Sequence, residues 1–494
     1  MNILEAIDDP NLFAPWFRDS STWSAWRAFL AALFALPMSD AEFELFTRYT
    51  RRATAPAAPF SEAYLVCGRR AGKSAVLALL AVFIATFRDY SAYLAPGERG
   101  TLPIIASDRR QARTIFRYMR ALLHEIPLLA QLVQRETSES FDLSNRVTLE
   151  IHTSNYRSVR GYTLIGGLID ELAFLRSDDS ASPDVEVLAA LRPGMSTIPG
   201  AMLLCASSPY ARRGALWDAF QRWYGKDDAP VLVWKAPTRE MNPTVGQRTI
   251  DEAMSRDPAA ARAEYFAEFR TDVESYISLE ALKACVIEGV RERPPERQWR
   301  YVAFVDPSGG SSDSMTLGIA HKEGNTVILD ALREVPAPFS PEAAVEEFAD
   351  LLKKYRVVRV TGDRYGGEWP PEAFRKCGIV YVPSEKTKSQ LYIDLLPLIN
   401  SRAVDLLDHD KAVLQLVGLE RRTARGGRDS IDHGPGAHDD IANAIAGSLS
   451  LANELRGNYL DFRRQPKPLR APIVIPRWRQ IDPLNPNTNW MMRR

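Results

Sequence analysis

Short apolar runs alternate with amphipathic stretches over much of the chain. Between residues 63 and 208, five runs have the length and composition of buried strands: AYLVC, LPIIAS, VTLEIH, LIGGLIDE and AMLLCASS. Two segments among them, SAVLALLAVFIATF and DRRQARTIFRYMRALL, have helical length and spacing. Because strands that alternate with helices are typical of parallel β/α units, the pattern predicts an α/β domain over residues 61–275.

The alternation of predicted strands and helices resumes after a charged, proline-containing segment at 291–300, RERPPERQWR. Strands are predicted in YVAFVD, SMTLGIAHK, TVILDALREV, VVRVTGD and IVYVP, with a helix near 341–355 and a last helix from about 439 to 455. We therefore predict a linker over 276–300 and a second α/β domain over 301–455.

The two ends of the chain differ from these domains. Residues 1–60 are predicted to be helical, are rich in tryptophan and end in the loop TAPAAPF. Residues 456–494 hold six Pro and nine Lys or Arg against two Asp. This composition indicates a mobile or partner-bound tail, or alternatively a strap that buries its Ile and Trp side chains along a domain surface.

Composition narrows the function classes. Of the 494 residues, 46% are hydrophobic and 25% are charged, which is typical of a globular chain with a sizeable core. Lys plus Arg and Asp plus Glu both total 62, so an overall basic coat for nucleic acid is excluded, although local patches are not. The four cysteines form no CxxC pair, which argues against a zinc site or a disulfide framework. The sequence shows neither an apolar run of membrane-spanning length nor a signal-peptide pattern, so we expect a soluble, cytoplasmic protein.

The segment YLVCGRRAGKSAVLALL has the features of a nucleotide-binding P-loop. It places Gly72, Lys73 and Ser74 between an apolar strand and a helix. Phosphate is expected at the helix N-terminus, with Lys73 on the β and γ oxygens and the Ser74 hydroxyl on Mg²⁺. The sequence departs from the pattern GxxxxGK[ST] at the first glycine, which is replaced by Cys67.

A second strand, LIGGLIDE, ends in two adjacent acids that suit ATP hydrolysis. We expect Asp170 to hold the metal through water and Glu171 to orient and deprotonate the attacking water. If the P-loop is not taken into account, Asp170 and Glu171 are interpreted only as the surface end of a strand. A third strand, MLLCASSPY, ends in Ser207 and Ser208, which either sense a γ-phosphate or form a plain turn.

In the second predicted domain, four carboxylates stand at the ends of elements that are far apart in sequence. Asp306 and Asp363 end strands, and Asp439 and Asp440 open the last helix. Only a fold can bring them together, and clustered carboxylates repel one another unless cations neutralise them. They predict a site for two Mg²⁺ or Mn²⁺ ions that hydrolyses phosphodiesters. Taken singly, the acids are turn formers before glycine or a helix N-cap, and Asp313 is a weaker candidate.

Four arginines lie around two glycines just upstream, in LERRTARGGRDSIDH: Arg421, Arg422, Arg425 and Arg428. One interpretation is a solvated hairpin. The other is a flexible loop that neutralises the DNA backbone without reading its sequence.

A P-loop β/α domain followed by a carboxylate domain in this order resembles the large subunit of the tailed-phage terminase, the motor and nuclease that packages viral DNA. The resemblance covers roughly residues 62–455. The matching segments are GRRAGKS, the strand with Asp170 and Glu171, SSP at 207–209, QAR at 111–113 and HDD at 438–440.

The resemblance implies an N-terminal P-loop (ASCE, RecA-like) ATPase domain followed by an RNase H-like nuclease domain. The nuclease would cut concatemeric DNA with metals held by Asp306, Asp363, Asp439 and Asp440. Arg69 or Arg70 would serve as the P-loop arginine. Arg160 would enter a neighbouring subunit's ATP site, although it is otherwise only a turn residue before Gly161. The family often has an adenine-contacting Gln before the P-loop, but this chain offers only WSAWRAFL there.

The resemblance also implies cofactors and partners. ATP and Mg²⁺ are expected, with Mn²⁺ as an alternative at the nuclease site. The expected partners are double-stranded DNA, a small terminase subunit, the portal protein and sibling subunits in a ring on the procapsid, in the host cytoplasm and away from any membrane. Two rival functions remain: a repair helicase-nuclease, which needs a second RecA-like lobe, and a DNA-binding scaffold whose carboxylates are structural.

Overall fold

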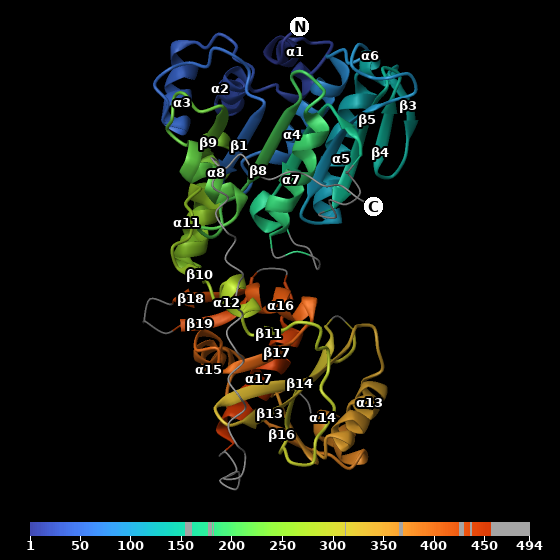
Figure 1. Cartoon of the computed structure of the whole chain (residues 1–494). Helices are drawn as coiled ribbons and strands as arrows, with labels where there is room; N and C mark the ends of the chain where they lie inside the picture. The colour runs from blue at the N-terminus through green and yellow to red at the C-terminus, as the bar shows by residue number, and fades with distance from the viewer. Residues whose placement is uncertain are drawn as a thin grey trace, which may run out of the picture. The chain divides into compact units, whose positions relative to one another are not determined.

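The computed structural model describes residues 1–153, 161–175, 180, 182–311, 313–364, 369–423, 429–434 and 437–455. Two large β-sheets, each with its own helices, and a small three-stranded sheet make up this part of the chain (Figure 1). We call residues 1–275 the first lobe and residues 276–455 the second lobe. The predicted tail at 456–494 lies outside the described residues.

The first lobe begins with helices, as the sequence predicts. They are α1 (Ile3–Asp8), α2 (Ser24–Leu33) and α3 (Asp40–Thr50), with two short 3₁₀ turns, Ala14–Trp16 and Ser20–Trp23, between α1 and α2. A capping box starts α1 and another starts α3, through Asn2 with Glu5 and Ser39 with Glu42. These side chains satisfy free N–H groups of the first turn, which explains where both helices begin.

Six parallel strands form the centre of the first sheet. Their order is β9 (Val231–Ala236), β1 (Glu62–Cys67), β8 (Met202–Ser207), β7 (Gly166–Asp170), β2 (Gly100–Ala106) and β5 (Val147–Thr153). The antiparallel strands β4 (Ser140–Leu143) and β3 (Val133–Glu136) extend the sheet past β5. Strand β8 lies between β1 and β7, which is the strand order of ASCE, RecA-like ATPases.

The single strand predicted for LIGGLIDE is wrong in one respect. Leu164 ends the short strand β6 (Thr163–Leu164), Ile165 belongs to neither strand, and β7 begins at Gly166. Among the described residues, β6 pairs only with β2, whereas β7 runs between β2 and β8. The acids at the end of β7 nevertheless keep the position that the sequence predicts.

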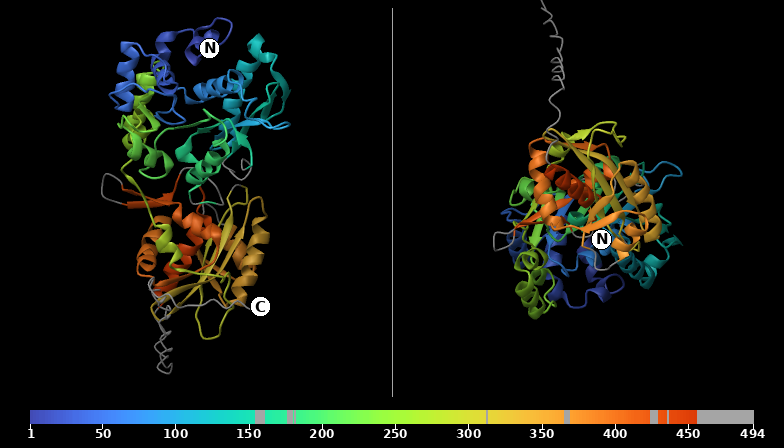
Figure 2. Two further views of the ribbon diagram at one scale, coloured as in Figure 1. Left: turned by 45° about the horizontal axis from the view of Figure 1, so that its top comes forward. Right: turned by 90° about the horizontal axis from the view of Figure 1, so that it is seen from below.

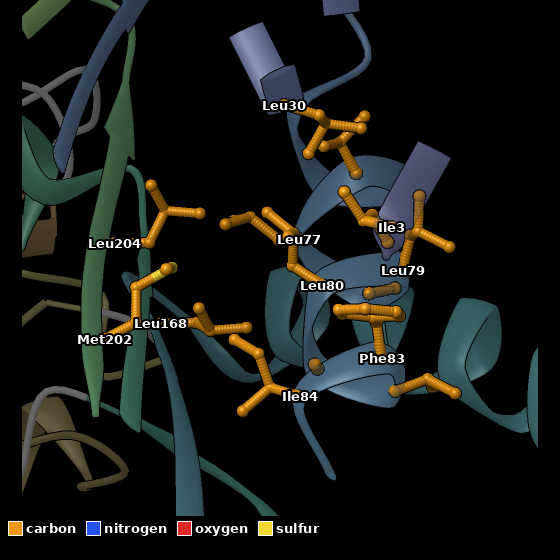
Figure 3. Close-up of a cluster of buried hydrophobic side chains, with 14 of the residues drawn as sticks. Ile3, Leu30, Leu77, Leu79, Leu80, Phe83, Ile84, Leu168, Met202 and Leu204 are labelled. Carbon is orange, nitrogen blue, oxygen red and sulfur yellow. The ribbon is translucent and has the colours of Figure 1, made fainter. Parts of the chain in front are cut away.

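Helices cover both faces of the first sheet. Helix α4 (Lys73–Thr86) and α5 (Arg109–Glu125) pack on one face with the N-terminal helices, and α7 (Pro183–Met195) and α8 (Ala215–Trp223) pack on the other. Figure 3 shows Leu77 and Ile84 of α4 directed toward Leu168 and Leu204 of the sheet. The N-terminal helices enclose α4 as well, so this helix is apolar on nearly all sides, as expected for a core helix.

Shorter elements complete the first lobe. They are α6 (Pro127–Ala130), α9 (Thr238–Met241), α10 (Gln247–Arg256), α11 (Pro258–Phe266) and β10 (Val273–Ser275). Strand β10 pairs with β18 (Leu419–Thr423), which forms a hairpin with β19 (Asp429–His433). The arginine-bearing segment is therefore a β-hairpin.

The second sheet has seven strands, in the order β11 (Val286–Ile287), β17 (Val404–Leu407), β14 (Thr326–Val335), β13 (Met315–Glu323), β12 (Val302–Asp306), β15 (Arg359–Gly362) and β16 (Val380–Pro383). Strands β12, β13 and β14 form an antiparallel meander, and β15 and β16 run parallel to β12. The order β14-β13-β12-β15-β16 with these directions is the RNase H-like topology, as predicted.

Alternating side chains of this sheet build two apolar layers. Helices α13 (Pro341–Lys354) and α14 (Trp369–Lys376) cover one face, and α15 (Lys388–Asn400), α16 (Asp410–Val417) and α17 (Asp440–Glu454) cover the other. Helix α17, red in Figure 2, packs against β12, β13 and β14. It therefore brings its first turn, with Asp440, to the end of β12.

The linker predicted over 276–300 is wrong in its first half. Tyr276, Ile277, Leu282 and Cys285 are buried in the core of the second lobe, α12 (Leu279–Lys283) lies among them, and β11 pairs with β17. The proline and charge pattern marked only the later residues, whereas the apolar residues before it pack in the core of the second lobe. None of the helices in the described part of the chain is long and apolar enough to cross a membrane.

Close packing of α17 on the sheet gives a stability prediction. A Cβ atom at Gly447 would lie 2.2 Å from the ring of the fully buried Phe304. Gly447→Ala gains about 1 kcal/mol of helix propensity, but overpacking costs about 1–3 kcal/mol, and the ring that the new methyl group meets is fully buried. We expect a net loss of free energy of unfolding, measured by chemical denaturation. An increase in stability would show that Phe304 relaxes at little cost.

Candidate functional site

The P-loop forms where β1 ends and α4 begins. The chain leaves β1 at Cys67 and reaches α4 through Gly72, which has a φ of 101° that favours glycine. A second glycine, Gly68, is required for a different reason: a Cβ atom there would lie 2.2 Å from the Thr238 hydroxyl oxygen. Because Cys67 still belongs to β1, the residue that must be small is Gly68, which explains why the first consensus glycine is dispensable.

Lys73 is a buried ammonium at the start of α4, with a side chain only 5% exposed. Its Nζ donates to the carbonyl oxygens of Cys67 and Gly68 and to the Ser208 hydroxyl, each at 3.2 Å. It also lies 3.4 Å from a Glu171 carboxylate oxygen. The predicted lysine, acid and serine are thus in direct contact.

Asp170 lies fully buried at the end of β7. One of its oxygens accepts from the Ser74 hydroxyl at 2.9 Å and from the Gln111 amide at 3.0 Å. Burial, followed by the charge of Glu171, raises the pKa of Asp170 to about 6. A carboxylate whose charge is disfavoured in this way gains from a nearby cation, which fits the predicted role in holding Mg²⁺ with Ser74.

Glu171 adopts a left-handed backbone conformation, with a φ of 55°. Its side-chain oxygen accepts from the Ser207 hydroxyl and from the Ser208 N–H, both at 3.2 Å. A non-glycine residue in this conformation is uncommon and persists only when its surroundings fix it. The end of β8 supplies that support, so the two serines position the acid.

Two of the three arginines predicted for the nucleotide site, Arg69 and Arg70, are among the described residues. The exposed guanidinium of Arg69 lies 3.3 Å from Glu264, and Arg70 is an exposed residue with a φ of 66°. Arg160 lies outside the described residues. The roles of all three remain predictions.

In the second lobe the structure brings Asp306 and Asp363 together. Asp306 ends β12, Asp363 follows β15, and the amide nitrogen of Asn443 donates to both carboxylates, at 2.9 and 2.6 Å. Asn443 is fully buried, and its amide oxygen has no hydrogen-bond partner among the described residues. The sequence analysis did not single out Asn443. Its position three residues after Asp440, on the same helical face, was the available signal.

The electrostatics of this group indicate a cation site. Burial, followed by the charge of Asp363, raises the pKa of Asp306 to about 8. Burial also raises the pKa values of Asp363 and Asp440. The donor set of carboxylate oxygens and a buried amide oxygen suits hard divalent cations such as Mg²⁺ and Mn²⁺. These residues therefore fit the predicted metal site.

Asp439 and Asp440 are neighbours with different surroundings. Both carboxylate oxygens of the buried Asp439 are hydrogen-bonded, one to Lys388 at 2.9 Å and the other to Tyr392 at 2.8 Å. The charge of Asp440 raises the pKa of Asp306, and the charge of Asp439 raises the pKa of Asp363. Both acids thus act electrostatically on the pair Asp306 and Asp363, and Asp439 is in addition joined to α15 through Lys388 and Tyr392. Its role as a metal ligand remains a prediction.

Two of the four predicted DNA-binding arginines are described, and both have acidic partners. Arg421 donates to Asp429 at 2.8 Å, and Arg422 donates to the buried Glu420 at 3.3 Å. Arg425 and Arg428 lie outside the described residues. The structure supports the hairpin but leaves its contact with DNA a prediction.

Comparison with known proteins gives distant likenesses only. No protein-family model and no curated protein matches the chain. Among the solved structures that match it, the large terminase of bacteriophage HK97 is 16% identical, with 87% of this chain and 99% of that chain covered and a TM-score of 0.37. A large terminase from a thermophilic bacteriophage is 11% identical, with 84% and 99% covered and a TM-score of 0.37.

Another solved structure matches a shorter part of the chain. It is the large terminase nuclease of the thermophilic phage G20c with bound magnesium, 19% identical, with 36% of this chain and 96% of that chain covered and a TM-score of 0.32. Since all three TM-scores are below 0.5, the likenesses decide neither the fold nor the function. Both rest on the topology and contacts described above.

The raised pKa of Asp306 gives a pH prediction. Between pH 4 and pH 8 the folded protein keeps a proton that the unfolded chain has released, so Asp306 makes folding less favourable as pH rises. In metal-free buffer, Asp306→Asn should therefore raise the melting temperature relative to wild type, by roughly 2–5 °C at pH 8 and by less at pH 5. Mg²⁺ should stabilise wild type more than the variant at pH 8. A difference that does not depend on pH would contradict the burial of this charge.

Proposed function

We propose that the chain is a terminase large subunit, in which ATP hydrolysis drives double-stranded DNA into a procapsid and a two-metal endonuclease cuts the concatemer. One observation carries the proposal. A single chain holds a Lys73–Glu171–Asp170 group at an ASCE sheet and, at the end of an RNase H-like sheet, Asp306 and Asp363 joined through Asn443, with the charge of Asp440 acting on Asp306. The first suits nucleotide hydrolysis, and the second suits phosphodiester cleavage.

For ATP hydrolysis, each residue has a defined task. Lys73 stabilises charge on the β and γ oxygens, and the Ser74 hydroxyl and Asp170 hold Mg²⁺, which neutralises the phosphates when bound. Glu171, held by Ser207 and Ser208, accepts the proton of the attacking water. Arg70, with Arg69 beside it, acts on the nucleotide of its own subunit, and Arg160 completes the site of a neighbour. Hydrolysis would then depend on the assembled ring.

For DNA cleavage, the acids of the second lobe hold two Mg²⁺ or Mn²⁺ ions, which activate water and stabilise the leaving oxygen when bound. Asp306, Asp363 and Asp440 supply the charge, with Asp439 as the fourth predicted acid. The hairpin arginines Arg421, Arg422, Arg425 and Arg428 neutralise the DNA backbone. A small terminase subunit selects the DNA, and the portal protein anchors the ring in the host cytoplasm.

The helicase-nuclease alternative is less well supported. Such an enzyme needs a second RecA-like sheet, and the second large sheet in the described part of the chain has the RNase H-like order instead. A scaffold with structural carboxylates is also disfavoured, because burial raises the pKa values of Asp306, Asp363 and Asp440, whereas a stabilising ion pair would lower them.

The ATP site is tested by Lys73→Ala and Glu171→Gln. Each should lower the rate of phosphate release on the order of 100-fold or more, because one removes charge from the β and γ oxygens and the other removes the water acceptor. DNA cutting in Mn²⁺ should persist in both variants. Glu136→Gln, in which a glutamate of β3 paired with Arg120 loses its charge, is the control. Near wild-type hydrolysis by Glu171→Gln would refute the assignment of β7.

The nuclease site is tested by Asp306→Asn, Asp363→Asn and Asp440→Asn, assayed by nicking of plasmid DNA. Each variant should lose most cleavage, because each loses a charged ligand from a site that holds cations. ATP hydrolysis should continue. Asp350→Asn, a change at an exposed acid of α13, should cut normally. If the three variants cut like wild type, the nuclease lies elsewhere or the acids are structural.

A further inference from the structure

The outer side of the P-loop is held by three hydrogen bonds that the nucleotide chemistry does not itself require. The Thr238 hydroxyl donates to the carbonyl oxygen of Arg69 at 2.8 Å, and the Asn242 amide donates to that of Arg70 at 2.8 Å. The Trp26 indole N–H donates to the carbonyl oxygen of Ala71 at 2.9 Å. Three consecutive peptide carbonyls are thus bonded to side chains from α2 and from both ends of α9.

The geometry of the peptide bond links these hydrogen bonds to the direction of the neighbouring N–H groups. In a trans peptide the C=O and the N–H of the next residue point in opposite directions. Fixing the carbonyls of residues 69–71 outward therefore turns the N–H groups of Arg70, Ala71 and Gly72 inward, to the side where phosphate is expected. The N–H of Ala71 makes only a long contact, with 3.4 Å between its nitrogen and the Gly68 carbonyl oxygen. Within the described residues, the N–H groups of Arg70, Gly72, Lys73 and Ser74 form no hydrogen bond.

The loop needs such support because its own sequence specifies it weakly. Arg70 has a φ of 66°, in a region that non-glycine residues rarely adopt, and Cys67 replaces the first glycine of the usual pattern. Backbone conformations of this kind persist when the surroundings over-determine them. Two of the three donors come from rigid positions, because Trp26 is 1% exposed and Thr238 is fully buried.

We propose that Trp26, Thr238 and Asn242 form an outer clamp that presets the P-loop N–H groups for the phosphates of ATP or ADP. These are positioning residues, because they touch the loop and not the nucleotide. The inference rests on the proposed ATP site. It also gives the N-terminal helices a part in nucleotide binding, through the Trp26 side chain of α2.

The first test is the dissociation constant of a fluorescent ATP analogue and of its ADP counterpart, measured with the full chain. Thr238→Val removes the donor and keeps the shape. It should weaken binding about 5- to 13-fold, since one hydrogen bond contributes about 1–1.5 kcal/mol. Thr238→Ser should restore most of the affinity because it restores the hydroxyl. Arg239→Ala, a change on the exposed side of α9, is the control.

Asn242→Asp is the second variant. The Asn242 side-chain oxygen also accepts from the Thr244 hydroxyl at 2.6 Å, and the aspartate keeps that bond while losing the donor to Arg70. It should weaken binding at least as much as Thr238→Val. Plasmid cutting in Mn²⁺ should be unchanged in both variants, which separates a local effect from unfolding.

The outcomes separate the clamp from the proposed function. If wild type binds neither nucleotide, the ATP site and the clamp are both refuted. If wild type binds ATP, and either Thr238→Val or Asn242→Asp binds it equally well while cutting DNA, the clamp alone is refuted. Loss of affinity in both variants, with rescue by Thr238→Ser, supports the clamp, because a merely structural threonine would lower stability without this pattern.

Discussion

Burial of carboxylates at strand ends is the constraint on which both sites depend. Parallel strands end at the same edge of a sheet, so acids that are distant in sequence converge there and lose their hydration together. The effect is visible in the pKa values, which rise to about 6 for Asp170 and to about 8 for Asp306. Such groups are unfavourable as bare anions and become favourable when a cation or a strong donor lies beside them.

The two lobes meet this constraint in different ways. The first lobe carries its own buried cation, Lys73, which contacts Glu171, and Asp170 accepts a hydrogen bond from the Ser74 hydroxyl. In the second lobe, Asp306 and Asp363 share only the amide of Asn443, which neutralises no charge. Lys388 is bonded to Asp439 rather than to these two acids. The charge of Lys388 still lowers the pKa values of Asp306 and Asp363, but burial outweighs this effect and both pKa values stay raised.

The N-terminal helices are integral to the first site. Without a regular first glycine, the P-loop is supported by donors from outside the loop, and one of them, Trp26, comes from α2. The same helices cover α4, whose first residue is Lys73. Packing that holds α4 in place thus also holds the Lys73 ammonium and the loop before it, so the stability of the N-terminal segment and the geometry of the P-loop are physically linked.

The sequence by itself determined what is local. The strand–loop–helix order around Gly72–Ser74, the acids that end β7 and β12, and the start of α17 all follow from periodicity and from residue types at fixed spacing. The tertiary structure decided what depends on direction and distance. Gln111, Lys388 and Trp26 each act through a contact that spans tens of residues, and no spacing marks such contacts. For Asn443 the spacing from Asp440 marks the helical face, but only the fold shows that its amide reaches both Asp306 and Asp363. Asp439 and Asp440 show the physical reason most clearly. Adjacent residues at a helix start point about 100° apart, so only the packing of α17 against β12 and α15 decides which of the two bonds to Lys388 and Tyr392.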